Sequence, residues 1–210
     1  MIQKNIPNKI AIFPLSKAIF FPGTVLPLNI FEKRYIQLVS DSMKKKRLFG
    51  MVQPKNKLTK KTDIYKVGCL GKIISFNETG DKRFIIALSG IIRFKIKQEI
   101  DNNKLYREFE VDYSDYLSDL EIKKNKSIDK INLIKKVEFL FKKKNYSVKI
   151  EEFKKLNTDQ LINTISMISP FSIEEKQKLI ETIKIEDKLK ALNDIINFNL
   201  LDNLETKTIQ

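Results

Sequence analysis

The sequence predicts an α+β protein with a β-rich first part and a helical second part. The chain has 210 residues, 42% of them hydrophobic, which is enough to bury a sizeable core. Up to about Tyr116, apolar residues alternate or form short β-branched runs between turn residues, as in strands. After Ser118 they recur at spacings of three and four, as in helices. We therefore predict a β-rich subdomain over residues 1–118 and a helical bundle over residues 119–210.

Six or so strands around a short helix are expected in the first part. Pro14 and Pro27 restrict the first two strands to an edge, an end or a bulge. Gly68 and Gly71 indicate bulges or close backbone approach, and Ser89-Gly90 is expected to separate two strands. Because crossover helices are missing, the strands predict a curved sheet or small barrel. The predicted segments are 10–15, 24–28, 47–53, 64–76, 83–88, 91–100 and 104–116.

The short helix is expected to begin within the stretch FFPGTVLPLNIFEKRY, residues 20–35. Asn29 followed by Glu32 three residues later resembles a capping box, which marks a helix N-terminus. The spacing then places Phe31 and Tyr35 on one helix face. The stretch is therefore predicted to form strand, turn, strand and helix start, with Phe31 and Tyr35 docking the helix on the sheet.

The second part predicts about four helices with apolar stripes and polar outer faces. Asn157 with Gln160, and Ser172 with Glu175, have the spacing of N-terminal capping boxes. Pro170 is expected to end the helix that Asn157 begins. Together these segments predict a small helical bundle. The predicted helices span 128–144, 157–168, 172–182 and 185–201.

The chain lacks the usual residues of several catalytic and metal sites. It has no histidine, which excludes Ser-His-Asp and Cys-His nucleophiles and every zinc site that uses histidine. Neither a GxxxxGK[ST] nor a GxGxxG phosphate loop occurs, nor a GxSxG motif. We predict a non-enzyme without cofactor or metal. A hydrolase that uses serine and lysine stays open, because both residues are abundant and no spacing singles out a pair.

The single cysteine and the N-terminus predict a cytoplasmic protein without a membrane partner. Cys69 cannot form an intramolecular disulfide, and its apolar surroundings favour a buried small hydrophobic side chain. Prolines, a glycine and Lys17 interrupt the apolar run at residues 15–30. This run therefore predicts neither a signal peptide nor a spanning helix.

The net charge of +14 raises the possibility of nucleic-acid binding. However, arginine supplies five of the forty basic residues, and the lysines are spread along the chain without interleaved aromatic residues. A solvated lysine-rich surface is therefore favoured. A basic RNA-binding protein remains the alternative, and it requires the lysines to gather on one face.

Several ordered blocks resemble the Lon N-terminal (substrate-binding) domain family. They are FPL at 13–15, FPG-VLPL-IFE-RY across 21–35, VGCLGKI at 67–73 and LSG-RF around 88–94, within a match covering roughly residues 10–201. The resemblance implies a PUA-like β-rich subdomain followed by a helical bundle. In full-length Lon proteases this domain precedes an ATPase and a serine-lysine peptidase domain, helps recognise substrates and helps assemble the ring. This chain looks like a stand-alone member.

The resemblance, together with the missing catalytic groups, implies a non-catalytic module that binds exposed apolar or unfolded polypeptide segments. Such a module could be an adaptor in proteolysis or protein quality control, with a protease or chaperone as partner, and its oligomeric state stays open. Peptide binding requires an exposed patch or groove of apolar side chains. The candidates are Phe20, Phe21, Phe49 and Met51.

Overall fold

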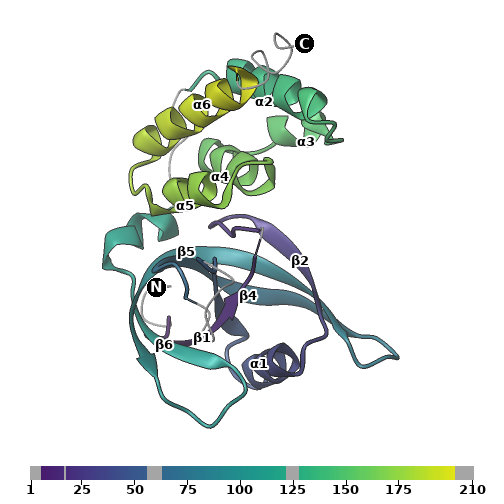
Figure 1. The fold of residues 1–210 in the computed structure, drawn as a ribbon, viewed down its shortest axis with the longest axis vertical. Helices are drawn as coiled ribbons and strands as arrows, with labels where there is room; N and C mark the ends of the chain where they lie inside the picture. The colour runs from purple at the N-terminus through teal and green to yellow at the C-terminus, as the bar shows by residue number, and fades with distance from the viewer. Residues whose placement is uncertain (1–5, 17, 56–62, 122–127, 202–210) are drawn as a thin grey trace, which may run out of the picture. The chain divides into compact units, whose positions relative to one another are not determined.

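The chain folds into two compact units, Met1–Ile122 and Lys123–Gln210. The computed structural model describes residues 6–16, 18–55, 63–121 and 128–201. Strands dominate the first unit and helices form the second, so the predicted α+β class is confirmed (Figure 1).

Five strands of the first unit close into a barrel, and a sixth extends it. The sheet order is β2-β5-β4-β3-β1-β6, and the ring closes because β6 also pairs with β5. The neighbours β1 and β3 run parallel, whereas the other pairs are antiparallel. The edge strand β2 pairs with the first part of β5. The strands are β1 (Lys9–Pro14), β2 (Val25–Ile30), β3 (Leu48–Val52), β4 (Val67–Glu78), β5 (Phe84–Ile100) and β6 (Arg107–Asp112).

Strand β5 is continuous, so the predicted break at Ser89-Gly90 is wrong. Gly90 is needed for a different reason: a Cβ atom there would lie 2.0 Å from the carbonyl oxygen of Phe21. The Gly90 N–H donates to Thr24, and the Gly23 N–H donates to Gly90. Glycine therefore lets the turn before β2 cross closely over β5. The paired β4 and β5 form a long hairpin that projects from the barrel (Figure 1).

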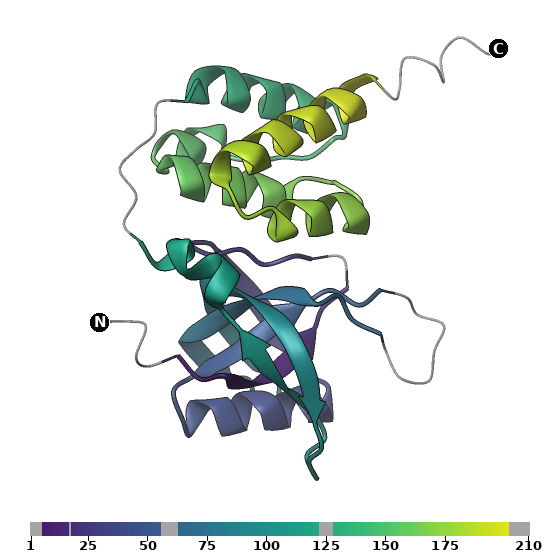
Figure 2. The same cartoon turned by 90° about the vertical axis from the view of Figure 1, so that its left-hand side faces the viewer.

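Helix α1 (Lys33–Met43) lies across one end of the barrel (Figures 1 and 2). Its N-cap is Glu32, and Asn29 belongs to β2, so the predicted capping box is wrong. Tyr35 is buried, and its ring stacks on Phe13 with centroids 4.0 Å apart. Phe31 is 63% exposed, so Tyr35 docks the helix without it.

The last predicted strand ends earlier than expected. Strand β6 stops at Asp112, and a 3-10 helix, η2 (Ser114–Leu120), follows. Tyr116 of η2 is buried, and the guanidinium of Arg93 lies 4.5 Å from its ring centroid. Tyr116 therefore continues the apolar pattern of β6 in sequence but is buried from a 3-10 helix. The burial predicted for Cys69 is confirmed, with 0% of the residue exposed.

The second unit packs its helices around an apolar core. The side chain of Asn157 caps α4 and that of Ser172 caps α5, and both capping boxes are confirmed. Helices α2 and α6 lie side by side, and Lys136 Nζ of α2 lies 3.4 Å from Asn193 Oδ1 of α6 (Figure 2). The short α3 was not predicted. The helices are α2 (Lys130–Lys143), α3 (Ile150–Lys154), α4 (Thr158–Ile168), α5 (Ile173–Glu181) and α6 (Ile185–Leu201).

Candidate functional site

The four residues predicted to bind peptide are core residues of the β-rich unit. Each of Phe20, Phe21, Phe49 and Met51 is at most 4% exposed. Phe49 and Met51 lie in β3, which has β1 on one side and β4 on the other. The expectation that these four side chains form an exposed patch is therefore wrong. Apolar type alone could not separate core residues from surface residues.

A different set of apolar side chains is exposed on one face of the β2-β5-β4 extension. Val25 of β2, Ile74 of β4 and Ile85 of β5 are 50%, 56% and 48% exposed. Pro27 of β2 is also exposed. We call these four residues the apolar strand face. Large aliphatic side chains that gather on one face, instead of scattering, are typical of interaction surfaces.

The strand register places these residues on the same side of the sheet. Residues that lie directly opposite each other in an antiparallel pair share a face. Val25 is opposite Ser89, Pro27 is opposite Ala87, and Asn29 is opposite Ile85. On the other side of β5, Lys72 is opposite Ser89, Ser75 is opposite Ala87, and Asn77 is opposite Ile85. The face therefore consists of three rows, each crossing β2, β5 and β4.

A register shift in β4 brings an additional side chain to this face. Ile73 pairs with Leu88 and Ser75 pairs with Ala87, which leaves Ile74 as the extra residue of a bulge. Ile73 is 2% exposed, whereas Ile74 is 56% exposed. Bulges commonly redirect a side chain in this way. Lys72 and Ser75 share this face although they are three residues apart, so the bulge lets Ile74 and Ser75 be exposed together.

The opposite side of β2 and β5 is buried and supports the face. Leu28 and Ile30 of β2, and Ile86 and Leu88 of β5, are at most 9% exposed. Because side chains alternate along β2 and β5, one set packs in the core and the other set faces solvent. Pro27 lies on the edge strand, as predicted for a proline-bearing strand. Because proline lacks an N–H, this edge is a poor template for an added strand, and a ligand would contact side chains instead.

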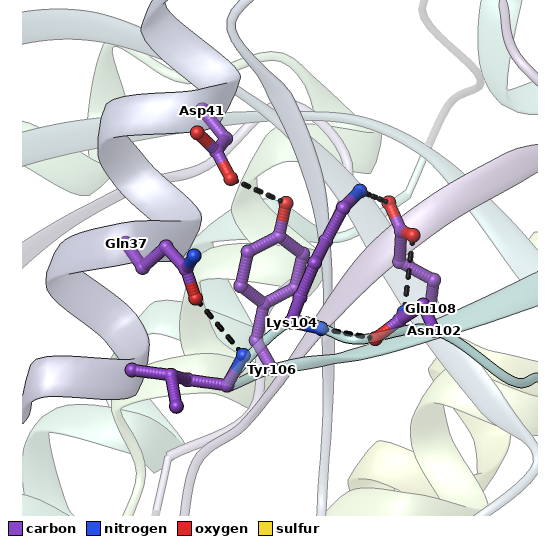
Figure 3. A network of polar contacts seen from close by, with 7 residues as sticks. Gln37, Asp41, Asn102, Lys104, Tyr106 and Glu108 are labelled. Carbon is purple, nitrogen blue, oxygen red and sulfur yellow. Dashed lines mark hydrogen bonds and ion pairs between the residues drawn. The ribbon is translucent and has the colours of Figure 1, made fainter.

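A network of polar groups fixes the β5–β6 connection to α1 (Figure 3). The Tyr106 hydroxyl donates to Asp41 at 3.0 Å, and the Leu105 N–H donates to Gln37 at 2.9 Å. Lys104 Nζ lies 2.7 Å from a Glu108 carboxylate oxygen. Burial, followed by the hydrogen bond to Asp41, raises the pKa of Tyr106 to about 12. A neutral tyrosine that donates to a carboxylate is suited to anchoring the loop rather than to proton transfer at pH 7.

The buried lysines of the helical unit make structural contacts. Lys176 Nζ donates to the Met167 carbonyl at 3.1 Å, and Lys188 Nζ donates to Asn163 at 3.1 Å. The first contact satisfies a carbonyl in the last turn of α4, where a positive charge also complements the helix dipole. Within the described residues no cluster of three or more Cys, Asp or Glu side chains could hold a metal ion. No helix in the described part of the chain is long and apolar enough to cross a membrane.

The sequence matches one known protein family over most of its length. Residues 9–197 match the "ATP-dependent protease La (LON) substrate-binding domain" family. The chain belongs to this family. Among curated relatives, Lon protease of Syntrophus aciditrophicus is 26% identical over 207 residues, and that of Anaeromyxobacter dehalogenans is 23% identical over 200 residues. Both alignments cover 93% of this chain, and they cover 26% and 24% of the respective relatives. The Lon family member described here thus spans about a quarter of the length of these relatives.

Solved structures show the same fold. The Lon N-terminal domain protein from Xanthomonas campestris aligns with a TM-score of 0.65 at 19% identity, covering 89% of this chain and 97% of that one. The N-terminal domain of Mycobacterium avium complex Lon protease gives a TM-score of 0.63 at 15% identity, covering 90% and 98%. The predicted resemblance to Lon N-terminal domains is therefore confirmed.

Proposed function

We propose that this Lon-family domain is a non-catalytic binding module for exposed apolar or unfolded polypeptide segments. The apolar strand face is the observation that carries the proposal. It presents Val25, Ile74 and Ile85 to solvent on a sheet in which the opposite side of β2 and β5 is buried. An unfolded chain exposes similar aliphatic groups, and removal of both surfaces from water favours association.

We further propose that the module acts as an adaptor in proteolysis or protein quality control, with a protease or chaperone as partner. Membership of a substrate-binding domain family supports this role. The proposal places the protein in the cytoplasm, because its single cysteine, Cys69, is buried and unable to form an intramolecular disulfide.

The proposal is tested by titrating the protein into a labelled, reduced and alkylated polypeptide that cannot refold. Fluorescence anisotropy should show saturable binding, and Ile85→Ser should weaken it because the substitution removes an exposed aliphatic group from the face. Ile131→Ser is the matched control, since Ile131 is a 70% exposed isoleucine of α2. Equal affinity in both variants would argue against the apolar strand face as the site. Absence of binding in the unsubstituted protein would overturn the function itself.

A further inference from the structure

The strands that form the apolar strand face carry an uneven set of charges. Residues 1–31, 64–77 and 84–98 contain neither aspartate nor glutamate. These ranges include all of β2, β4 as far as Asn77, and β5 as far as Gln98. Lys72 lies in the same row as Val25, beside the apolar strand face, and is exposed opposite Ser89. A ligand on this face therefore meets apolar, neutral and basic side chains without a carboxylate from these strands.

Further basic residues lie in a turn that is hydrogen-bonded to β4 at one end of the face. The Ile73 N–H donates to the Arg47 carbonyl at 2.9 Å, which brings the turn after α1 to the row that contains Lys72. Lys44, Lys45 and Arg47 are exposed in this turn. Together with Lys72 they form the basic end. None of these four side chains makes an ion pair with any residue that the structure describes.

The other end of the face differs in charge. Its row consists of Asn29, Ile85 and Asn77, all without charge. The hairpin turn beyond it holds both signs, and Arg83 Nε forms an ion pair with Asp81 at 2.9 Å. The charges of that turn, on Glu78, Asp81, Lys82 and Arg83, balance in sign, whereas the charged side chains of the basic end are all positive. A ligand that lies along the face therefore meets positive charge at one of its ends and neutral residues at the other.

We propose that the apolar strand face binds an extended aliphatic segment that carries acidic residues at the end placed against Lys72 and Arg47. This inference rests on the proposed function and assigns a substrate class to the same site. From Ser89 to Ile85 the rows extend over roughly 13 Å at the rise of a strand. A segment of about four or five extended residues covers that length. Its aliphatic side chains lie on Val25, Ile74 and Ile85, and its carboxylates reach the basic end.

The side chains on the face favour polypeptide over nucleic acid. Nucleic-acid surfaces without sequence preference combine basic groups with aromatic rings on which bases stack. Here the four residues of the apolar strand face are all aliphatic, and Val25 shares the row of Lys72. Aliphatic groups contact aliphatic peptide side chains well, whereas they provide no stacking surface for bases. Positive charge next to them therefore selects acidic residues within an apolar segment.

The inference is tested with three labelled peptides that share one five-residue aliphatic core, flanked on one side by two Asp, two Asn or two Lys residues. Anisotropy titrations at low salt should give the tightest binding for the Asp peptide, by about threefold to tenfold over the Asn peptide, and the weakest for the Lys peptide. Added salt should reduce the difference. Lys72→Gln should weaken binding of the Asp peptide about twofold to fivefold. Lys135→Gln, an exposed lysine of α2, should leave it unchanged.

The outcomes separate the inference from the function on which it rests. Equal binding of the three peptides, still weakened by Ile85→Ser, would overturn the acidic preference and keep the proposed function. Absence of binding by all three would overturn both. A uridine oligonucleotide added as competitor should leave the Asp peptide bound. Displacement of the peptide, together with steep loss of oligonucleotide binding in salt, would overturn the inference in favour of nucleic acid.

Discussion

The guanidinium of Arg93 holds the carboxylate of Asp119 in a buried, two-point ion pair. Arg93 Nε and Nη2 lie 2.9 Å and 2.8 Å from the two carboxylate oxygens, and the Arg93 main-chain N–H also donates to Asp119. The side chains are 2% and 8% exposed. Because Arg93 lies in β5 and Asp119 in η2, the pair fastens the end of the β-rich unit to its longest strand.

Removal of one partner of this pair should strongly destabilise the β-rich unit. Asp119→Asn leaves the Arg93 charge buried without its counter-charge, which typically costs about 3–5 kcal/mol. Glu32→Gln is the matched control, because the Arg34–Glu32 pair is about half exposed and typically contributes about 0–1 kcal/mol. Thermal unfolding followed by circular dichroism checks both variants. Similar unfolding midpoints would contradict the structural role assigned to Asp119.

Gly90 should be intolerant of any side chain. Gly90→Ala places a methyl group where the Phe21 carbonyl oxygen lies, 2.0 Å from an ideal Cβ, so the turn before β2 must move. Overpacking of this kind typically costs about 1–3 kcal/mol. Gly80 has nothing within 4 Å of its Cβ position, so Gly80→Ala is the control and should fold normally. Urea unfolding compares the two, and the prediction fails if Gly90→Ala is as stable as Gly80→Ala.

Core and surface residues of the β-rich unit should respond differently to truncation. Phe49→Ala removes a fully buried ring and should cost about 3–5 kcal/mol in unfolding free energy. Ile85→Ser alters a side chain that is 48% exposed and should change stability by about 0.5 kcal/mol or less while weakening peptide binding. Denaturant titration and peptide anisotropy are measured on the same samples. Loss of binding by a fully folded Phe49→Ala protein, with Ile85→Ser unaffected, would restore Phe49 as a binding residue.

The stability of the helical unit should rise with pH in the alkaline range, because the buried Lys176 loses its proton there. Burial lowers the pKa of Lys176 below its usual 10.5, so the unfolded chain binds this proton more tightly than the folded chain. The free energy of unfolding therefore rises as the pH increases from the pKa of Lys176 in the folded protein towards 10.5. Lys176→Met should abolish that rise. Lys178→Met, an exposed position on the same helix, should retain it.

The measurement is the unfolding midpoint of the helical unit between pH 8 and pH 11, followed by circular dichroism at the helix band. Identical pH slopes for the two lysine variants would show that Lys176 titrates alike in the folded and unfolded states.

Local chemistry explains why the helices of the second unit were easier to predict than the strands of the first. The capping boxes of Asn157 and Ser172 involve residues three positions apart, so their spacing alone identifies a helix start. Asn29 and Glu32 have the same spacing, yet Asn29 is paired with Ile85 in the sheet. Long-range pairing therefore overrode a local signal that was correct elsewhere in the same chain.

The exposed face could not be identified from the sequence because it depends on register. Alternation in β5 separates Ile85 from Ile86, but only pairing with β2 decides which of them faces solvent. The bulge between Ile73 and Ser75 leaves no compositional sign, and the buried Ile73 and the exposed Ile74 are both isoleucine. An apolar aromatic residue such as Phe21 suits a binding surface and a barrel core equally well, and it lies in the core.

The most direct test of the central claim is to locate bound polypeptide on the chain. An apolar peptide carrying a photoreactive benzophenone side chain is bound, irradiated and mapped by mass spectrometry. The account predicts cross-links to residues of β2, β4 and β5 around Val25, Ile74 and Ile85, and their loss when an unlabelled peptide competes. Cross-links confined to the helical unit, or unaffected by the competitor, would contradict it.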